Sequence, residues 1–531
     1  MGKMPSVLEK IRVLGENSKY DICASTASSR TEKYPKLFGD SNKWIGATAS
    51  AGICHSYTPD GRCMSLFKTL YTNKCIYNCK YCFSHSCKKK MSFTPEEYAR
   101  TFMKLYSMNV VEGVFISSAV SGSADETTEE MLEAIQLLRF KYNFRGYVHF
   151  KCLPGVSQYL LKEAITLSDR ISINTEASTK EYLAEIAEQK DFNNDILTRQ
   201  RWLKQIRIKH NCETLKVMRD LKQDNSGKNQ EKMITDRRSN GYKKFKWDGA
   251  PILNSGQTTQ FVVGAAEDET DYDLLKRIDW GYREVDLRRA YFSSFIPIEG
   301  TPLGNKQAAS LEREHRLYQT DWLLRIYQYN LKDLREIITD NGNLPRGDPK
   351  IHLAHHYFND HNLVDTPVAK KINHMMREVS TESYRAIQFT RTEINNRGVL
   401  YGVVFLKHRV IDLVLKYLHE RFGSHCIICL YNEGTHKTAI MNEKGRIRVV
   451  KSSLMKIVKD LSENRPIIPY FDDIQFSGQK IFETLYASQF ISERKNKSYF
   501  KKMIPDKCFE LPGMRGGVEK GFRNKKINDF L

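Results

Sequence analysis

Three cysteines in the sequence have the residue type and the spacing of metal ligands. Cys75, Cys79 and Cys82 form a C-x₃-C-x₂-C pattern, in which the aromatic Tyr81 precedes the last cysteine. Thiolates are the soft ligands that iron–sulfur clusters select, and three of them leave one iron of a [4Fe–4S] cluster open to another ligand. An open iron indicates chemistry at the cluster rather than electron storage alone.

Zinc is the alternative for the same cysteines, because structural zinc sites also use closely spaced cysteines. His85 and Cys87 lie near enough in the sequence to complete a tetrahedral zinc site. A second metal site, for an auxiliary cluster or zinc, would draw on three earlier cysteines and a fourth ligand: Cys23, Cys54, Cys63, and Cys87 or His55. Free cysteines are also common as small buried apolar residues, so both interpretations of these cysteines stay open.

The C-x₃-C-x₂-C spacing, with Tyr81 at the aromatic position, resembles the cluster motif of the radical S-adenosylmethionine (SAM) superfamily. The resemblance implies that the open iron binds the amino and carboxylate groups of SAM. One electron then cleaves SAM to methionine and a 5′-deoxyadenosyl radical, which abstracts hydrogen from the substrate, so that the cofactor supplies the chemistry. It also implies an electron donor such as flavodoxin or ferredoxin.

Up to about residue 350, short β-rich runs alternate with helical patterns, which predicts an α/β fold built on a parallel sheet. The predicted strands are 69–72, 113–118, 146–152, 170–174, 260–264 and 288–295. The predicted helices are 94–107, 127–140, 157–167, 179–186, 307–330 and 331–341. Six strands with connecting helices predict a partial (β/α)6 barrel of the radical SAM type, whose active site lies at the carboxyl ends of the strands.

The chain is expected to divide into three parts. Residues 1–68 form a cysteine-containing extension, 69–350 the partial barrel, and 367–531 a smaller α+β domain with strand, helix, strand and strand at 401–405, 410–422, 425–431 and 439–441. A basic segment, 190–255, interrupts the alternation of strands and helices. We expect this segment to be an insertion over the barrel mouth.

Polar residues end several predicted strands, where barrel enzymes bind their ligands. Ser117 and Ser118 end the second strand, at which the superfamily places groups that bind the amino end of SAM, although its usual Gly-Gly-Glu is absent. Asn174 and Glu176 end the fourth strand and are candidates for hydrogen bonds to the ribose. One polar residue after a strand often caps the next helix, but their joint placement favours a site.

The fifth strand continues into a pattern, 260–267, that resembles the superfamily's adenine-supporting G-x-I-x-G-x-x-E motif. Gln260 replaces the first glycine of the motif, Val262 and Gly264 match the next two positions, and Glu267 ends it. Gly264 would let the backbone approach a ligand closely. Val262 and Gly264 are therefore candidate cofactor-binding residues.

Three further cysteines invite a chemical role. Cys152 ends the third strand and is a candidate hydrogen-atom donor, with simple packing as the alternative. Cys426 and Cys429 form a C-x-x-C, but they lie in an apolar strand rather than at a helix N-terminus that would stabilise a thiolate. We therefore expect Cys426 and Cys429 to be core residues.

The net charge of +20 is large for an enzyme of small metabolites. Between residues 199 and 248 there are 15 lysines and arginines against 6 acidic residues, and the aromatic Trp202, Tyr242, Phe245 and Trp247 are interleaved with them. Such a segment fits phosphates and unpaired bases, or it is simply a solvated insertion. With a second basic stretch at 494–526, a polyanionic partner is expected.

Composition also bears on where the protein works. No run approaches the ~18 uninterrupted apolar residues that a membrane helix needs, and no secretory signal follows the N-terminus. The clustering of cysteines between Cys54 and Cys87 fits metal binding in a reducing compartment better than disulfides. A cytoplasmic protein without a membrane partner is expected.

Longer ordered motifs resemble a narrower family, the bacterial DNA modification/repair radical SAM proteins. They lie at 19–21, 52–56, 60–63, 72–73, 112–113, 154–155, 169–170, 256–257, 263–265, 313–319 and 348–350. The C-terminal part, at 377–391, 407–422 and 491–505, resembles an uncharacterised domain encoded beside or fused to uracil-DNA glycosylases. The resemblance implies nucleic acid as the substrate, with DNA favoured over RNA. The helix–hairpin–helix that commonly ends the family is absent here.

Overall fold

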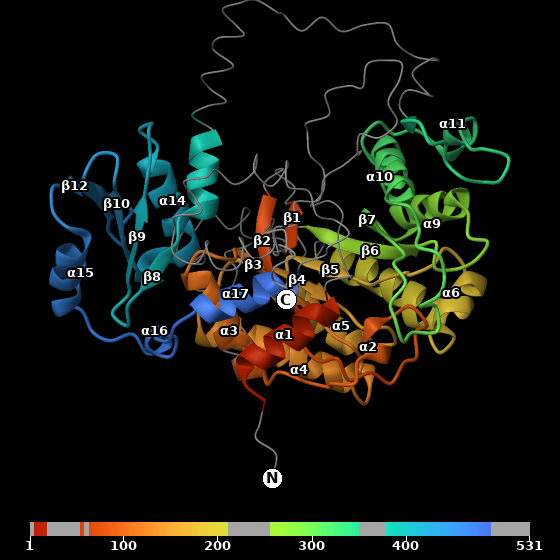
Figure 1. Ribbon diagram of the computed structural model, residues 1–531, viewed down its shortest axis with the longest axis horizontal. Coiled ribbons are helices and arrows are strands. Elements are labelled where there is room, and N and C mark those ends of the chain that lie inside the picture. Colours follow the sequence, from red (N-terminus) through yellow and green to blue (C-terminus); the bar gives the residue numbers. More distant parts are fainter. Residues whose placement is uncertain are drawn as a thin grey trace, which may run out of the picture.

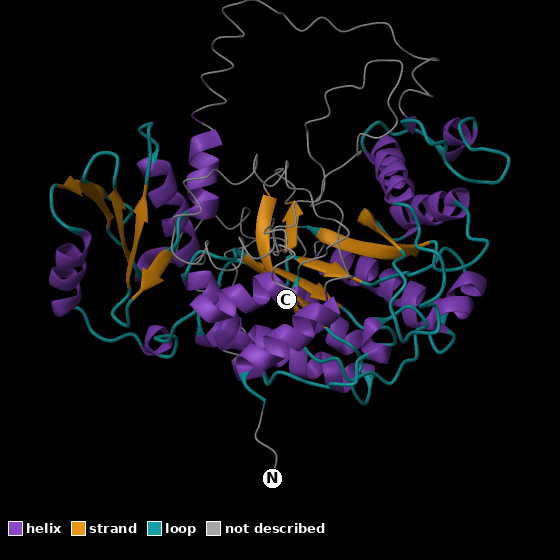
Figure 2. Ribbon diagram, in the orientation of Figure 1, coloured by secondary structure: helices purple, strands orange, loops and turns teal. Residues whose placement is uncertain are grey.

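A computed structural model of the protein describes residues 5–18, 54–57, 63–210, 255–349, 379 and 381–489. A seven-stranded sheet follows the chain in the order β1-β2-β3-β4-β5-β6-β7, and helices cover its outer face (Figures 1 and 2). All neighbours from β2 to β7 are parallel, whereas β1 runs antiparallel to β2. Six parallel strands confirm the predicted partial (β/α)6 barrel.

The strands of this sheet are β1 (Cys54–Tyr57), β2 (Cys63–Leu70), β3 (Gly113–Ser117), β4 (Tyr147–Lys151), β5 (Arg170–Ser172), β6 (Gly256–Val263) and β7 (Leu287–Ser294). Most lie within a few residues of their predicted positions. The first parallel strand, β2, begins at Cys63 rather than at residue 69, and β1 was not predicted. The start of β2 alternates faces: Met64 and Leu66 pack with Phe115 inside the sheet, while Phe67 joins the core under the helices. This alternation with a period of two indicates a strand, whereas a short apolar run by itself does not distinguish a strand from a buried helix.

The helices of the barrel region are α1 (Val7–Ser18), α2 (Phe83–Ser86), α3 (Pro95–Ser107), α4 (Ala124–Gln136), α5 (Gln158–Leu167), α6 (Lys180–Ala187), α9 (Asp271–Glu284), α10 (Leu311–Arg325) and α11 (Leu331–Arg335). Several begin at a hydroxyl cap, as in α3, where Thr94 accepts the Glu97 N–H and Glu97 accepts the Thr94 N–H. Helices α10 and α11 are shorter than the two helices predicted there. Among the described residues, none of the helices has both the length and the apolarity to cross a bilayer.

The first part of the predicted basic insertion belongs to the barrel. Residues 192–198 form a π-helical turn (Phe192–Thr198) whose Phe192, Ile196 and Leu197 are buried in the main core, and helix 199–210 continues from it. These residues therefore pack as part of the barrel, beside the loop after β4, where the Gly155 N–H donates to the Asp195 carbonyl at 3.2 Å. The rest of the segment, 211–254, lies outside the described residues.

Alternation along β4 separates the core from the barrel interior. Val148 and Phe150 face the helices within the main core. On the opposite parity, Tyr147 packs with the interior of β2 and β3, and His149 is 3.0 Å from the Ser172 hydroxyl of β5. Lys151 ends the same inward row. The inward row of β4 thus changes from the apolar cluster around Tyr147 to the polar His149 and Lys151, and the inward positions near the carboxyl ends of the strands form the site described below.

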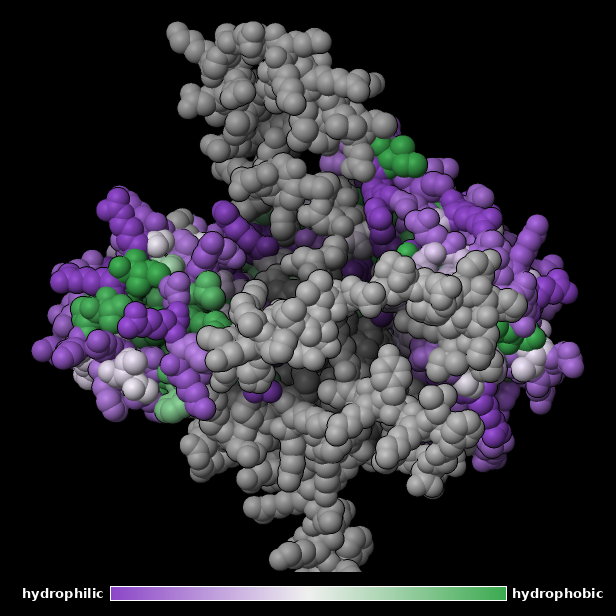
Figure 3. All heavy atoms as spheres, turned by 90° about the horizontal axis from the view of Figure 1, so that it is seen from above, coloured by the Kyte–Doolittle hydropathy of each residue, from purple (hydrophilic) through white to green (hydrophobic). Residues whose placement is uncertain are grey.

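The C-terminal domain holds a second sheet in the order β12-β11-β10-β9-β8. Its elements are β8 (Thr392–Ile394), β9 (Val399–Val404), α14 (Ile411–Phe422), β10 (Ile427–Asn432), β11 (Lys437–Met441), β12 (Ile447–Val450), α15 (Leu454–Glu463), α16 (Pro469–Asp472) and α17 (Gln479–Ser488). Helices α14 and α15 pack on opposite faces of this sheet. The described part confirms a smaller α+β domain. Apolar side chains gather on its surface (Figure 3), and the exposed ones include Ile447 and Val449 of the edge strand β12.

Buried polar contacts join this domain to the barrel beside α3. The Asn109 amide donates to the Ile387 and Thr390 carbonyls at 3.0 and 2.5 Å, and Arg421 donates to the Val111 carbonyl at 2.9 Å. The Tyr417 hydroxyl donates to the Glu112 carboxylate. Helix α17 also lies along α1 (Figure 1), where the Gln489 amide donates to the Gly15 carbonyl at 2.9 Å. The two domains therefore share an ordered interface.

Glu269 ties the loop after β6 to the segment before α6. Its carboxylate accepts the Ser178 N–H at 2.5 Å, while its second oxygen is buried without a hydrogen-bond partner among the described residues. Burial raises the pKa of Glu269 to about 7, although the bonds from Ser178 and the charge of Arg313 lower it. The folded protein therefore binds this proton more tightly than the unfolded chain, whose glutamate titrates near its ordinary value of 4.5.

We expect this carboxyl to make the protein less stable as the pH rises. Its contribution is fully present below pH 4.5 and is lost as the pH passes 7, by about 3 kcal/mol in all, because each pKa unit corresponds to ~1.4 kcal/mol. Glu269→Gln should remove that loss, so that the variant gains stability over the parent protein between pH 5 and pH 8. Urea unfolding at both values measures the difference. Glu267→Gln, at an exposed position two residues earlier, is the control. Its stability relative to the parent protein should be nearly the same at pH 5 and at pH 8.

Candidate active site

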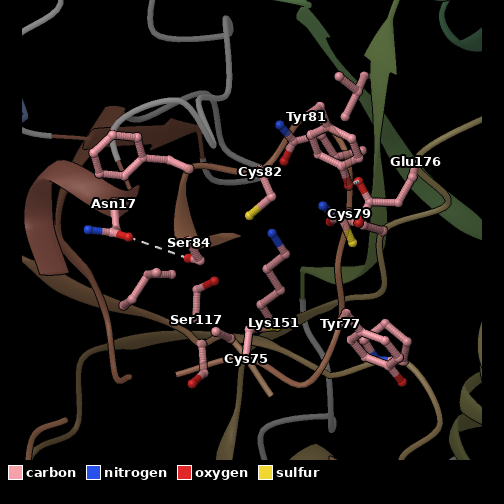
Figure 4. A pocket seen from close by; sticks show the side chains of 18 of the residues that line it. Asn17, Cys75, Tyr77, Cys79, Tyr81, Cys82, Ser84, Ser117, Lys151 and Glu176 are labelled. Carbon is pink, nitrogen blue, oxygen red and sulfur yellow. Dashed lines mark hydrogen bonds between the residues drawn. The ribbon is translucent and has the colours of Figure 1, made fainter. Parts of the chain in front are cut away.

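The carboxyl ends of the six parallel strands surround one cavity of about 190 Å³ (Figure 4). Of the residues predicted for the site, ten line it: Cys75, Tyr81, Cys79, Cys82, Ser117, Ser118, Cys152, Asn174, Glu176 and Val262. Residues that were not predicted also line it, and they include Asn17, Lys151, Lys190, Gln260 and Ser293. The structure thus brings together side chains as far apart along the chain as Asn17 and Ser293.

The cysteine loop follows β2 and is fastened at both of its ends by backbone hydrogen bonds. The Ile76 N–H donates to the Val120 carbonyl at 2.8 Å, just beyond β3. The Lys80 N–H donates to the Ile186 carbonyl of α6, also at 2.8 Å. The position of the three cysteines is therefore set by the β/α units of β3 and β5, and all three line the cavity.

Burial disfavours the charged form of these thiols. It raises the pKa of Cys79 to about 11, against the lowering effect of the Lys190 charge, and it raises the pKa of Cys82 despite hydrogen bonds from Ser84. A metal ligand must be a thiolate, so a bound group that carries positive iron charge is what stabilises this set of donors. Among the described residues, no three His, Cys, Asp or Glu side chains are arranged to hold a single metal ion.

Glu176 connects the loop to the end of β5. Its carboxylate accepts a hydrogen bond from the Tyr81 hydroxyl and forms an ion pair with Lys190 at 3.0 Å. Burial alone would raise the pKa of Glu176, but the charges of Lys190 and Lys151 and the bond from Tyr81 outweigh it and hold the pKa below its ordinary value. The Lys190 ammonium also lies 5.8 Å from the ring of Tyr77, within the cysteine loop. The carboxylate is therefore ionised and oriented.

Two further groups in the cavity suit a polar ligand. The Ser117 hydroxyl is buried and has no hydrogen-bond partner among the described residues, whereas the Ser118 hydroxyl accepts the Thr72 N–H at 3.3 Å. Lys151 reaches from β4 toward the space between the cysteines (Figure 4). An orphan hydroxyl and an ammonium beside three thiols fit an amino acid-like ligand next to a cluster.

Comparisons with known protein families decide the class of this site. Residues 69–221 match the family model of the Radical SAM superfamily. The chain carries a radical SAM domain. The expectations of an enzyme, of a [4Fe–4S] cluster and of SAM as cofactor are thereby confirmed. Residues 353–511 match a second model, DUF4130, a domain of unknown function, and this range overlaps most of the predicted C-terminal domain, 367–531.

Solved structures were also compared with the chain. Methylornithine synthase (PylB) is 13% identical over 48% of this chain and 60% of its own, and the [FeFe]-hydrogenase maturase HydG is 9% identical over 49% and 50%. HydG from Carboxydothermus hydrogenoformans is 10% identical over 59% and 66%. Each has a TM-score of 0.34, too low for a conclusion, and the chain spans less than two thirds of these proteins. No curated protein sequence matches the chain.

Within the radical SAM domain, the side chains proposed for zinc have other contacts. The Cys87 sulfur accepts long contacts from the amides of Asn17 and Asn73 at 3.6 and 3.5 Å, and His85 is exposed. Neither lines the cavity among its described residues. Asn17, from α1, is held by the Val13 carbonyl at 2.7 Å and faces Ser84 (Figure 4), which bonds to Cys82. Helix α1 thus contacts the cluster loop through Asn17, and no motif in the sequence predicted this contact.

Gly264 lies apart from the other predicted cofactor-binding residues. It adopts φ +80° at the end of β6, and a Cβ there would lie 2.8 Å from the Cβ of Ala309. The glycine therefore permits a tight turn against the segment before α10, and it is absent from the described lining of the cavity. Glu267 of the same pattern is exposed. Only Val262 and Gln260 of this motif reach the site.

The remaining cysteines fall into two groups. Cys426 and Cys429 are fully buried in the C-terminal domain, and burial raises the pKa of each to about 12, as expected for core residues. In the register of β1 and β2, Cys54 is opposite Leu66 and Cys63 is opposite Tyr57. Cys54 and Cys63 are therefore not a cross-strand pair, because three residue positions separate them along the two strands. Cys23 lies outside the described residues, so a second metal site stays a prediction.

Proposed function

We propose that the protein reductively cleaves SAM and uses the resulting 5′-deoxyadenosyl radical to modify or repair nucleic acid, with DNA favoured over RNA. The observation that carries the first half is the convergence of Cys75, Cys79 and Cys82 with the ends of all six strands on one cavity. Bound there, the cluster would supply one electron to SAM, and the protein's residues would hold and orient both cofactors.

Within this proposal, different residues of the cavity lining bind the cluster and the parts of SAM. Cys75, Cys79 and Cys82 ligate three irons. The Ser117 hydroxyl, unpartnered among the described residues, binds the amino end of SAM, and Asn174 binds the ribose. Val262 supports the adenine. Glu176 was predicted to bind the ribose too, but its bonds to Tyr81 and Lys190 make it a positioning residue for the cysteine loop.

Charge and family resemblance support nucleic acid as the substrate. The chain carries +20, and 15 basic against 6 acidic residues lie between positions 199 and 248. Basic groups neutralise phosphates, and aromatic side chains stack on unpaired bases. A base within a duplex cannot reach a cavity inside a barrel, so we propose a flipped or single-stranded nucleotide. The Cys152 thiol, buried in the cavity wall, is the proposed hydrogen-atom donor. We place this chemistry in the reducing cytoplasm.

Two alternatives make different predictions. An RNA-modifying enzyme would share the cofactors and change a nucleoside of RNA. A metal-stabilised binding protein without turnover would bind nucleic acid and form no 5′-deoxyadenosine. Anaerobic reconstitution with iron, sulfide and SAM separates turnover from binding before any substrate is known.

We expect nucleoside mass spectrometry to name the substrate. DNA and RNA from cells with and without the gene are digested and compared, and DNA should gain or lose one nucleoside. A catalytically silent version of the gene, with Cys79→Ala, is the matched control and should behave as the deletion. A change confined to RNA would establish the RNA alternative, and unchanged nucleosides in both polymers would refute the nucleic-acid proposal.

A further inference from the structure

The outer face of the cluster loop is rich in lysine. Its exposed residues, which we call the cluster-loop face, are Lys74, Ile76, Asn78, His85, Lys88, Lys89 and Lys90. Lys89 pairs with Glu9 of α1, but residues 71–92 themselves contain no acidic residue to balance these four lysines. Ile76 follows Cys75 directly in the C-x₃-C half of the motif and is 52% exposed. The face is therefore cationic, with an apolar residue within it.

Hydrogen bonds hold the lysines next to the cluster ligands. The Asn73 amide donates to the Lys89 carbonyl at 2.9 Å, and the Asn73 side-chain oxygen accepts the Met91 N–H at 2.7 Å. The Lys90 ammonium donates to the Ser84 carbonyl at 2.5 Å. Asn73 precedes Cys75 by two residues, and Ser84 follows Cys82 by two. The lysine run is thus fixed to both ends of the cysteine motif.

We propose that the cluster-loop face is the docking site of a small acidic one-electron carrier protein; this inference rests on the proposed cleavage of SAM. Each cleavage consumes one electron: the carrier is oxidised by one electron, the C5′–S bond of SAM breaks, and methionine and the 5′-deoxyadenosyl radical form. The cluster must receive that electron from outside. Electron transfer weakens steeply with distance, so a donor works best where the cysteine loop itself is exposed.

The chemistry of the face matches such a partner. Lysines steer an acidic protein by long-range attraction, and an exposed isoleucine supplies an apolar contact when the partners meet. The phosphates of DNA would be bound by the lysines alone, because an apolar side chain such as Ile76 makes no favourable contact with a phosphate. The combination of charge and an apolar residue beside the cluster therefore favours a protein partner over nucleic acid.

Two reductants test the proposal on the full-length, reconstituted enzyme. Formation of 5′-deoxyadenosine is measured with reduced flavodoxin, an acidic carrier, and with dithionite, which needs no docking site. The double variant Lys88→Glu/Lys89→Glu should raise the half-saturating flavodoxin concentration about tenfold at low salt, and added salt should narrow that gap. Turnover with dithionite should stay within about twofold of the parent enzyme, given that neither lysine touches the cavity. Ile76→Ser should weaken the response to flavodoxin at every salt concentration.

Matched controls separate this result from other causes. Lys332→Glu/Lys456→Glu reverses two exposed lysines on α11 and α15 and should change neither assay. Equal losses with both reductants would mean that the face supports the cluster rather than a partner. Loss of single-stranded DNA binding with an unchanged flavodoxin response would assign the face to nucleic acid and overturn the proposal. A parent enzyme that forms no 5′-deoxyadenosine with dithionite would refute the proposed function instead.

Discussion

Cys79→Ala should abolish the iron–sulfur cluster and, with it, the cleavage of SAM. Cys79 is the most buried of the three motif cysteines, and apart from Cys75 and Cys82, Cys152 is the one described cysteine that lies in the same cavity. Two remaining thiolates hold a [4Fe–4S] cluster poorly, because each thiolate anchors one iron. Reconstituted under anaerobic conditions, the variant should lose the visible absorbance of the cluster and form no 5′-deoxyadenosine above background, a loss on the order of a hundredfold or more.

Cys87→Ala is the matched control for this prediction. Cys87 lies five residues after Cys82, yet its sulfur contacts Asn17 and Asn73 rather than the cavity. The variant should keep its cluster and its turnover, with at most a modest loss of stability. A Cys87→Ala protein that is as iron-free as Cys79→Ala would show that Cys87 is a ligand. Stoichiometric zinc in the parent protein after anaerobic purification would contradict the cluster itself.

The sequence predicted the site as far as local patterns could reach. The cysteine spacing and the polar ends of successive strands placed Cys75, Ser117 and Asn174 in one cavity, because parallel strands bring their carboxyl ends to the same edge of a barrel. A strand end is visible in a sequence as an apolar run followed by polar residues. The six parallel strands followed from the same alternation of patterns, whereas the early starts of β2 and β6 and the antiparallel strand β1 were missed.

The residues that escaped prediction reach the site by routes that the sequence does not display. Asn17 arrives from α1, before the barrel begins, through packing of that helix against β2 and α17. Lys151 is an inward residue of β4, detectable only as the last member of the row Tyr147, His149, Lys151. Gly264 is the reverse case: its motif predicted a ligand contact, but its positive φ serves a turn. Which neighbour a turn or helix meets is settled by tertiary packing, not by spacing along the chain.

Lys190 shows most clearly how composition can mislead. It stands at the start of a segment whose charge resembles a solvated insertion, yet its side chain is only 8% exposed and pairs with Glu176 at 3.0 Å inside the site. Burial alone would lower the pKa of Lys190, but the neighbouring Cys79 and Glu176 raise it above its ordinary value, so the ammonium keeps its charge. A buried cation between a carboxylate and a ligand thiol is a positioning residue for the cysteine loop.

Lys190→Met should therefore destabilise the protein by about 3–5 kcal/mol, because it leaves the Glu176 carboxylate buried without its counter-ion. Removing both charges should destabilise the protein less. Lys190→Met/Glu176→Gln should regain most of the stability that Lys190→Met loses, because no unpaired charge is then left at this pair of positions. Urea unfolding of the four proteins in this double-mutant cycle gives the coupling energy. Iron content after reconstitution reports whether the loop still binds the cluster.

Lys180→Met is the matched control for Lys190→Met. Lys180 also lies beside a glutamate, Glu181, at 3.7 Å, but both side chains are more than 60% exposed. Removing this surface lysine should change the stability by no more than about 0.5 kcal/mol. A double variant as unstable as Lys190→Met alone would mean that Lys190 acts through packing rather than through its charge. An additive cycle together with full iron loading in Lys190→Met would show that the ion pair between Lys190 and Glu176 does not position the cysteine loop. The hydrogen bond from Tyr81 to Glu176 would then be the remaining polar contact between the loop and the end of β5.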